Sequence, residues 1–448
     1  MQPSEIAAGA GQVHGLIWAA PFLGVLASIA LLPAVAPRFW HRRMSWVVAF
    51  WILVLLVPEA VAWGPAQAAA GAWRAVLVEY LPFVTLLLAL FTVGGGVLVR
   101  GGVSGTPAGN TALLAIGTVL AGVMGTTGAA MVLIHPLLRA NAHRQQKMHL
   151  ALVFILLVAN AGGALSPLGD PPLYLGYLHG VPFFWPVRHL GLPLALLAGV
   201  VLAVFWPLDA ALARREGPPP PRERLHIRGW GNAMLVLLTG ATVLVLGGAN
   251  LGVVSIAGQE IGAGRLISIG VFVAITAASA WLTPRSIHQG NDFSWHPMIE
   301  VALLFLAIFI TIEPVLHMLE AGMAGPFAPL LRLLTDADGN PLPVAYFWLT
   351  GGVSAFLDNA PSYLVFFEIA GIRPETLSLT RSLELEAMSA GAVFFGALTY
   401  IGNAPNMMVR AIAAHRGVRM PGFFGFMAMA VAVLIPVFAV LTVVFFRP

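Results

Sequence analysis

The stretch Leu165-Ser166-Pro167-Leu168-Gly169-Asp170-Pro171-Pro172 decides the fold, because it interrupts an apolar run and recurs in related form further along the chain. The related stretch is Leu398-Thr399-Tyr400-Ile401-Gly402-Asn403-Ala404-Pro405, at an offset of 398 − 165 = 233 residues. Met124-Gly125-Thr126-Thr127-Gly128 and Leu357-Asp358-Asn359-Ala360-Pro361 form a second pair at the same offset, since 357 − 124 = 233. In a membrane protein, interrupted hydrophobic segments at corresponding positions of two halves point to a transport site.

The composition is that of an integral membrane protein. Of 448 residues, 59% are hydrophobic and 9% are charged, whereas roughly 25% of the residues of a soluble domain are charged. Cysteine is absent, which excludes disulfides and thiolate metal sites. The net charge of +4 comes with basic residues in short loops between apolar runs, the ordinary pattern of cytoplasmic loops. We therefore expect no nucleic-acid partner.

The apolar runs predict an all-α polytopic membrane protein with about ten spans of about 20 residues each. The expected spans lie near 15–36, 44–63, 80–99, 149–178, 190–207, 232–250, 265–283, 297–318, 386–409 and 423–446. Two of them, 149–178 and 386–409, contain one pair of repeated polar loops and are expected to be interrupted helices.

Two further apolar segments, 111–135 and 344–370, carry the other pair of loops in their middles. We expect each to be a re-entrant helical hairpin, because non-helical backbone at membrane depth is tolerated where protein or a water-filled cavity surrounds it. The alternative is a complete span at 111–135, which would place one of the basic loops that flank it on the outside.

The basic loops also set the orientation of the chain, because Lys and Arg concentrate in cytoplasmic loops. Counting spans from an outside N-terminus makes the second half begin on the opposite face from the first. We expect a first inverted repeat at 1–210, a cytoplasmic linker at 211–230 and a second inverted repeat at 231–448. Inverted repeats give two nearly equivalent conformations, which predicts transport by alternating access.

Ionisable groups inside a bilayer are costly and are functional candidates by default. Asp170 and Asp358 lie deep in apolar sequence and inside the repeated loops. We expect Na⁺ to bind at these two residues together with Asn359 and Asn403, because hard cations take carboxylate and amide oxygens. Further ligands are expected from polar residues at or beside the breaks, which are Thr126, Thr127, Ser166, Thr399, Asn160 and Asn406.

Glycine and proline explain why the helices break where they do. Glycine permits a break, and Asp or Asn can cap the following helix with Pro early in its first turn. The preceding half-helix leaves unpaired carbonyl oxygens that can coordinate a cation. The expected helix-breaking residues are Gly125, Gly128, Gly169, Pro171, Pro172, Pro361, Gly402 and Pro405. A capping function alone is the alternative role of Asp170, Asn403 and Asp358.

Motifs of other functional classes are missing from the sequence. There is no Gly-x-x-x-x-Gly-Lys-Ser/Thr loop for ATP, no His-Glu-x-x-His helix and no Gly-x-Ser-x-Gly elbow. We therefore expect a transporter rather than an enzyme, with no cofactor besides the coupling ions Na⁺ and H⁺. A passive channel is disfavoured by the repeated breaks. His135 could relay protons, although a structural role is the simpler interpretation.

The segment from Ala159 to Asp170 resembles the signature of the ion transporter superfamily, especially NhaD-type sodium/proton antiporters and the citrate transporter-like group. Phe356-Leu357-Asp358-Asn359-Ala360-Pro361 resembles the Asp-Asn hairpin tip of that superfamily, and residues 399–406 resemble its second interrupted helix. The resemblance covers about residues 80–446. It implies two inverted repeats whose hairpins and broken helices meet near the membrane centre, in a homodimer of a bacterial inner membrane.

The relatives include sodium-coupled dicarboxylate symporters, whose hairpin tips carry Ser-Asn-Thr motifs, but the tips here read Gly125-Thr126-Thr127 and Asp358-Asn359-Ala360. An anion site would also favour a deep Lys or Arg, and none lies deep in the repeated segments. An ionised Asp can bind Na⁺ or a proton but not both, which suffices for antiport. We expect sodium/proton antiport, with Na⁺- or H⁺-coupled uptake of citrate or another small carboxylate as the alternative. The expected partners are such a small ion or carboxylate and membrane lipid.

Overall fold

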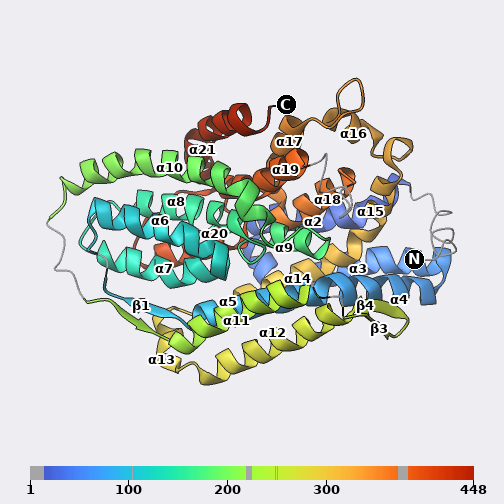
Figure 1. Cartoon of the computed structure of the whole chain (residues 1–448), viewed down its shortest axis with the longest axis horizontal. Coiled ribbons are helices and arrows are strands. Elements are labelled where there is room, and N and C mark those ends of the chain that lie inside the picture. The colour runs from blue at the N-terminus through green and yellow to red at the C-terminus, as the bar shows by residue number, and fades with distance from the viewer. Residues whose placement is uncertain are drawn as a thin grey trace.

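The computed structural model of the chain describes residues 15–102, 104–217, 224–247, 249, 251–371 and 382–447. Nearly all of the regular structure in these ranges is helical. Long helices such as α3 (Pro37–Trp63), α10 (Trp185–Ala213) and α12 (Ala263–Leu282) run along the long axis of the molecule (Figure 1). The expected all-α class is confirmed.

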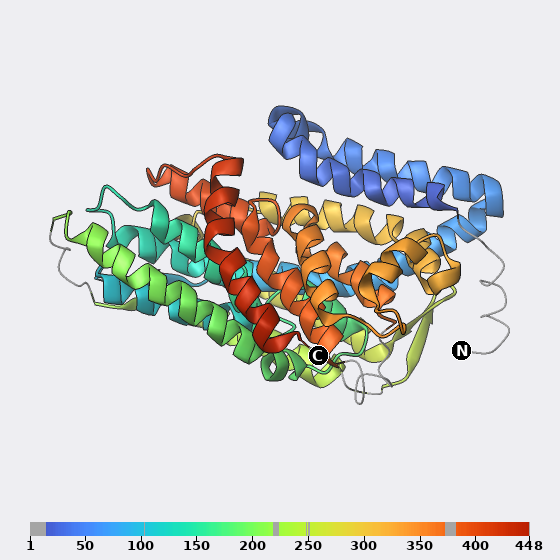
Figure 2. The ribbon, with the colours of Figure 1, turned by 90° about the horizontal axis from the view of Figure 1, so that it is seen from above.

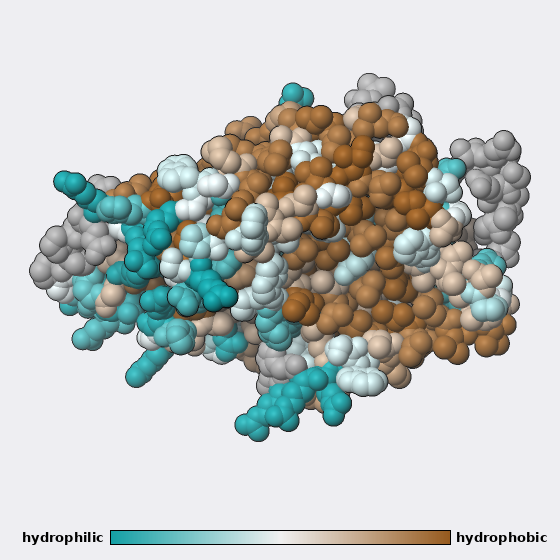
Figure 3. Space-filling view, turned by 90° about the horizontal axis from the view of Figure 1, so that it is seen from below, coloured by the Kyte–Doolittle hydropathy of each residue, from teal (hydrophilic) through white to brown (hydrophobic). Residues whose placement is uncertain are grey.

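The described residues hold nine helices that are long and apolar enough to cross a membrane. The number is ten if α14 (His296–Thr311) and α15 (Glu313–Glu320), which are bent by 44° relative to each other, count as one span. Figure 3 shows apolar side chains over much of one face, with hydrophilic side chains gathered at one end. The chain is an integral, polytopic membrane protein.

The first helices form a layer at one edge of the molecule. After the short 3₁₀ helix η1 (Leu16–Ala19), α2 (Ala20–Val35) and α3 lie side by side (Figure 2), and both contact α14. The next helical run is built from α4 (Pro65–Arg74), a π-helical turn η2 (Ala75–Tyr80) and α5 (Leu81–Gly95).

The prediction of a third span beginning near residue 80 was wrong at its start. The helical run begins at Pro65, because proline suits the first helical position and the alanine-rich sequence that follows has high helix propensity.

The hairpin segments are each two helices that meet at one residue. In the first, α6 (Pro107–Met124) contacts α7 (Thr126–Ala140), and Gly125 separates them. In the second, α17 (Pro343–Leu357) contacts α18 (Asn359–Ile369), and Asp358 separates them. Figure 1 shows α6 and α7 toward the end of the molecule with β1, and α17 and α18 toward the end with α15 and α16.

The interrupted segments also share one plan. The first consists of α8 (Met148–Leu157), a 3₁₀ turn η3 (Ala161–Leu165) and α9 (Pro171–Leu178). The second consists of α19 (Ser382–Phe395), a 3₁₀ turn η5 (Gly396–Leu398) and α20 (Ala404–His415). In both segments a non-helical break separates the 3₁₀ turn from the helix that follows.

The 233-residue offset recurs in the boundaries and backbone of these elements. The helices after the breaks begin at 126 and 359, and at 171 and 404, with 359 − 126 = 404 − 171 = 233. Gly125 has φ 81° and ψ 150°, and its counterpart Asp358 has φ 74° and ψ 148°. The inverted orientation of the halves, the entry of both hairpins from opposite membrane faces and the division at 1–210, 211–230 and 231–448 stay predictions.

Two short sheets complete the fold. β1 (Leu98–Arg100) pairs antiparallel with β2 (His226–Arg228), which lies within the expected linker. Residues 218–223 of that linker lie outside the described residues. β3 (Val253–Ile256) and β4 (Gln259–Gly262) form a hairpin between α11 (Trp230–Gly247) and α12. The remaining elements are α13 (Arg285–Gly290), η4 (Gly322–Ala324), α16 (Ala328–Leu334) and α21 (Phe423–Phe445).

Candidate functional site

A cavity of about 70 Å³ lies where the two hairpin tips meet the two interrupted segments. Since one water needs about 10–15 Å³ of such space, a few waters or a small, partly hydrated ion fit. Its polar lining comes from Thr126, Thr127, Asp170, Asp358 and Asn403. Among the described residues that line it, none is basic.

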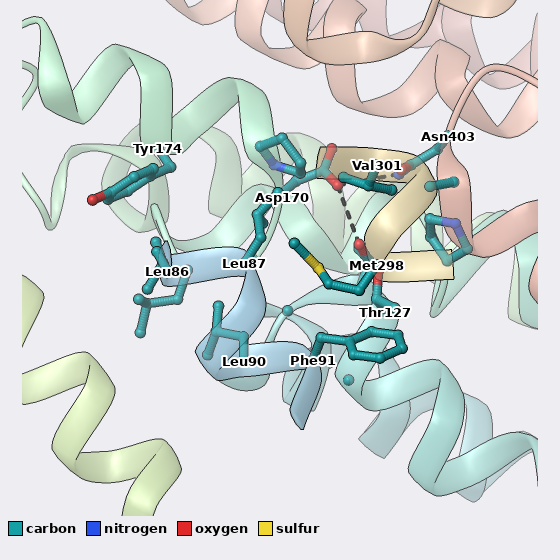
Figure 4. A pocket seen from close by; sticks show the side chains of 18 of the residues that line it. Leu86, Leu87, Leu90, Phe91, Thr127, Asp170, Tyr174, Met298, Val301 and Asn403 are labelled. Carbon is teal, nitrogen blue, oxygen red and sulfur yellow. Dashed lines mark hydrogen bonds between the residues drawn. The ribbon is translucent and has the colours of Figure 1, made fainter. Parts of the chain in front are cut away.

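The rest of the wall is mostly apolar, and part of it comes from helices outside the repeated loops. Figure 4 shows Leu86, Leu87, Leu90 and Phe91 of α5 on one side, with Met298 and Val301 of α14 opposite. Apolar walls lower the local dielectric and strengthen any electrostatic interaction inside the cavity. The two carboxyl groups that line this cavity, those of Asp170 and Asp358, are therefore its strongest electrostatic features.

Asp170, one of these two residues, is 2% exposed. Asn403 donates from Nδ2 to Oδ1 of Asp170 at 3.1 Å, and Thr126 donates from Oγ1 to the same oxygen at 3.2 Å. Asn359 donates from Nδ2 to the other oxygen, Oδ2. All three donors are neutral, so the buried carboxylate is hydrogen-bonded without being paired with a cation.

The donors of this cluster are related by the internal repeat. Thr126 and Asn359 occupy equivalent positions, since 359 − 126 = 233, and Asn403 is the equivalent of Asp170, since 403 − 170 = 233. The carboxylate of the first half thus accepts hydrogen bonds from both hairpin tips and from its own counterpart. A shift of either half relative to the other changes the coordination of Asp170.

One polar atom in the cluster is left over. The Oδ1 atom of Asn359 is buried and has no hydrogen-bond partner among the described residues. Buried side-chain polar atoms are paired in the large majority of cases, so an orphaned oxygen calls for an explanation. An amide oxygen is a ligand of the kind that hard cations take.

The geometry separates the capping and binding interpretations of the acidic residues. Asp170 and Asn403 precede α9 and α20, but neither side chain makes a capping hydrogen bond to its helix in the described structure. Asp358 does cap α18, since its Oδ1 accepts from the backbone N–H of Ala360 at 3.4 Å, and it also lines the cavity. Capping alone therefore does not account for Asp170.

Two of the expected ligands instead join the hairpins to the breaks. Ser166 donates from Oγ to the carbonyl oxygen of Gly122 at 2.5 Å, and Thr399 donates from Oγ1 to that of Ala355 at 2.5 Å. The two hydrogen bonds are equivalent in the repeat, because their donors and their acceptors are each 233 residues apart: 399 − 166 = 355 − 122 = 233. These hydroxyls hold the first arm of each hairpin against the neighbouring break and do not line the cavity.

The remaining two expected ligands bond to each other behind the cavity. Asn160 donates from Nδ2 to Oδ1 of Asn406 at 2.7 Å. Asn406 in turn donates from Nδ2 to the carbonyl oxygens of Gly396 at 2.8 Å and Thr399 at 2.9 Å. This network ties the two interrupted segments together at their breaks.

The helix-breaking glycines are required by close backbone contact. A Cβ atom on Gly169 would lie 2.2 Å from the carbonyl oxygen of Gly163, and one on Gly402 would lie 2.7 Å from that of Gly396. Of the expected breakers, five line the cavity, namely Gly125, Gly128, Gly169, Pro171 and Pro405. Pro172, Pro361 and Gly402 stand outside its lining.

A second buried charge cluster lies outside the residues predicted from the sequence. Arg144, one of the basic residues of the expected cytoplasmic loop after the segment 111–135, is 3% exposed and forms an ion pair with the fully buried Asp209. His149 contacts the same carboxylate through Nε2 at 2.8 Å, and Asn110 donates to it at 2.9 Å. An acid at the end of an otherwise apolar run was the available signal. His135 is also buried, with Nε2 3.1 Å from the carbonyl oxygen of Asn291, and does not line the cavity.

Comparison with known proteins places this geometry in context. The family model described as "Putative citrate transport" matches residues 11–446 of the chain. No curated protein matches the chain closely enough to be compared with it.

Proposed function

This chain belongs to the family described as "Putative citrate transport", and we propose that, as a secondary transporter, it exchanges Na⁺ for H⁺ by alternating access. The observation that carries the proposal is the environment of Asp170. Its buried carboxylate accepts three hydrogen bonds from neutral donors and shares a cavity with Asp358, and no described residue that lines the cavity is basic.

A carboxylate in this position has two ways to be neutralised. A proton can bind to one of its oxygens, or Na⁺ can bind between Asp170 and the amide oxygens of its neighbours. In the second case the amides of Asn359 and Asn403 turn so that their Oδ1 atoms face the ion, and Oδ1 of Asn359 is already unpaired. Because the two occupants exclude each other, Na⁺ entering from one side displaces a proton.

Ion binding is coupled to the opening of the cavity to one or the other side of the membrane, because the ligands come from four different segments. Thr126 and Asn359 lie at the tips of different hairpins, and Asp170 and Asn403 lie at different breaks. An occupied site joins all four segments, whereas an empty charged site leaves Asp170 without a compensating cation. Movement between two access states is then favourable only when Na⁺ or H⁺ is bound.

Uptake of citrate is the second candidate, and the description of the family favours it. The helices α7, α9, α18 and α20 all begin beside the cavity, and helix N-termini attract anions. Because the cavity has room for only a few waters and holds two carboxylates, citrate would need a wider form of this site and cations that neutralise Asp170 and Asp358.

The two candidates are distinguished in proteoliposomes that contain a pH-sensitive dye. Sodium/proton exchange predicts that an inward Na⁺ gradient makes the lumen more alkaline and an outward Na⁺ gradient makes it more acidic, with no requirement for citrate. Citrate uptake predicts accumulation of labelled citrate that depends on Na⁺ or H⁺. The Asp338→Asn variant, changed at an exposed loop position, should behave like the wild type and serves as the control for the Asp170→Asn variant. Citrate accumulation without Na⁺-driven proton movement would overturn the exchange proposal.

A further inference from the structure

A second pocket lies away from the central cavity, between the loop that precedes α8 and the loop that follows α20. Its volume is about 670 Å³. Gln145, Gln146, Lys147, His149 and Arg419 form its polar lining. It lies at the end of the molecule where α7 and α10 finish, which is the end with hydrophilic surface in Figure 3.

The charge of this pocket is positive. Lys147 is half-buried and Arg419 is exposed, and among the described residues that line the pocket none is acidic. Glu216 contacts the same loop, and its Oε1 accepts from the backbone N–H groups of Gln145 and Gln146 at 3.0 Å each. Glu216 is therefore engaged with backbone rather than with the two cationic side chains.

The buried acid beneath the pocket does not cancel this charge. Asp209 contacts His149, which lines the pocket, but Asp209 is already paired with Arg144. The charge of Asp209 is thus compensated inside the protein, and Lys147 and Arg419 are left facing the pocket. The helix α8 begins at Met148, and no side chain caps it in the described structure. Its first N–H groups add to the positive potential there.

We propose that this pocket binds a phosphate-type anion, supplied by the headgroup of an anionic phospholipid or by free phosphate. Lys147 and Arg419 would provide charge-assisted hydrogen bonds to the phosphate oxygens, and Gln145 and Gln146 would provide further donors. Basic pockets between spanning helices bind anionic headgroups at a membrane surface. The anion would join the loop after the first hairpin to the loop after the second interrupted segment.

The test uses full-length protein in nanodiscs of phosphatidylcholine alone or with phosphatidylglycerol. Tm is measured in both, and inorganic phosphate is then titrated into the phosphatidylcholine sample. We expect phosphatidylglycerol or phosphate to raise Tm. The Lys147→Gln/Arg419→Gln variant should weaken the effect by about 30-fold in ligand concentration, at roughly five- to sixfold for each basic residue. The matched control is Arg214→Gln/Arg215→Gln, which removes two exposed basic residues just after α10 and should leave the effect intact.

The outcomes of these measurements assign the anion or overturn the site. A response to phosphatidylglycerol alone assigns a lipid headgroup, and a response to phosphate as well assigns a free anion. An equal loss in both double variants, or no response in the wild type, overturns the proposal. A second measurement needs no variant: Lys147 of the wild-type protein is acetylated, and the product is followed by mass spectrometry. Bound anion should slow this acetylation severalfold relative to the same protein without the anion. An unchanged rate overturns the proposal.

Discussion

Replacing Asp170 by Asn removes one of the two carboxyl groups from the central cavity while keeping the shape of the side chain. In the wild type, both carboxylate oxygens accept hydrogen bonds, one from Asn359 and the other from Asn403 and Thr126. In Asp170→Asn one of these oxygens becomes an N–H₂ group that faces the N–H₂ group of Asn359. The unpaired Oδ1 of Asn359 lets that amide turn and accept the new hydrogen bond.

The magnitudes of the two effects differ widely. If the amide of Asn359 turns, the variant keeps its hydrogen bonds, and the free energy of unfolding should fall by no more than about 1 kcal/mol, against about 1–3 kcal/mol for an unpaired buried group. The attraction between Na⁺ and a carboxylate about 4 Å away is worth about 4 kcal/mol at an effective dielectric of about 20. Its loss should raise the Kd for Na⁺ about a thousandfold.

The assay measures Na⁺-dependent Tm shifts in detergent and Na⁺-driven proton movement in proteoliposomes on the same preparations. Asp170→Asn should keep the Tm of the Na⁺-free wild type within a few degrees and lose both Na⁺ responses. The double variant Asp170→Asn/Asn403→Asp returns one charge to the equivalent position of the other half and should recover part of the Na⁺ affinity. Unchanged Na⁺ affinity in Asp170→Asn would refute the assignment of the cation to this carboxylate.

Three other perturbations test separate parts of the structure. Asp358→Gly should raise Tm, because the backbone angles of Asp358, φ 74° and ψ 148°, lie in a region that costs a non-glycine residue about 1–3 kcal/mol. The same variant should lower Na⁺-driven flux. A lower Tm would show that the backbone of Asp358 is not strained. Gly169→Ala should strongly reduce folded yield because of the 2.2 Å contact with backbone, whereas Gly199→Ala, with nothing within 4 Å of the new Cβ, should leave yield intact. Backbone N–H groups of the loop before α8 lower the pKa of Glu216 below its ordinary value of 4.5. The hydrogen bonds that Glu216 accepts from this loop are therefore present above pH 4.5 and are lost as the pH falls through the lowered pKa. Their loss should appear as faster hydrogen exchange of the loop amides, corrected for intrinsic rates. The change should be absent in Glu216→Gln.

The sequence predicted the breaks well because their causes are local. Gly125 and Asp358 separate the hairpin helices where the paired loops indicate, and the helices after the interrupted segments begin directly after Asp170 and Asn403. Glycine and proline act on their own stretch of backbone, so no tertiary information is needed to place such a break. The clustering of Asp170 with Asn359 and Asn403 followed from the same repeat.

The roles of the flanking polar residues could not be read in the same way. A hydroxyl at a break can face an ion or a neighbouring carbonyl, and Ser166 and Thr399 both bond backbone oxygens 44 residues earlier in the chain. The partner of Arg144 is Asp209, 65 residues away. Nothing in either local sequence indicates that the two meet, because the contact depends on how α10 packs against the start of α8.

The hydrogen bond between Asp170 and Asn403 has a consequence for how such a protein could have arisen. Two residues at equivalent positions of a repeat contact each other only if they lie beside the axis that relates the halves. In an ancestor built from two identical chains, this position would meet its own copy, giving either two carboxylates within about 3 Å or two amides and no charge. Adjacent carboxylates cannot both remain ionised, so a symmetric ancestor with Asp in both copies would hold one negative charge shared, with a proton, between two carboxyl groups. Fusion of the halves into one chain lets one copy be Asp while the other is Asn, which confines the charge to one carboxylate and places an amide donor beside it.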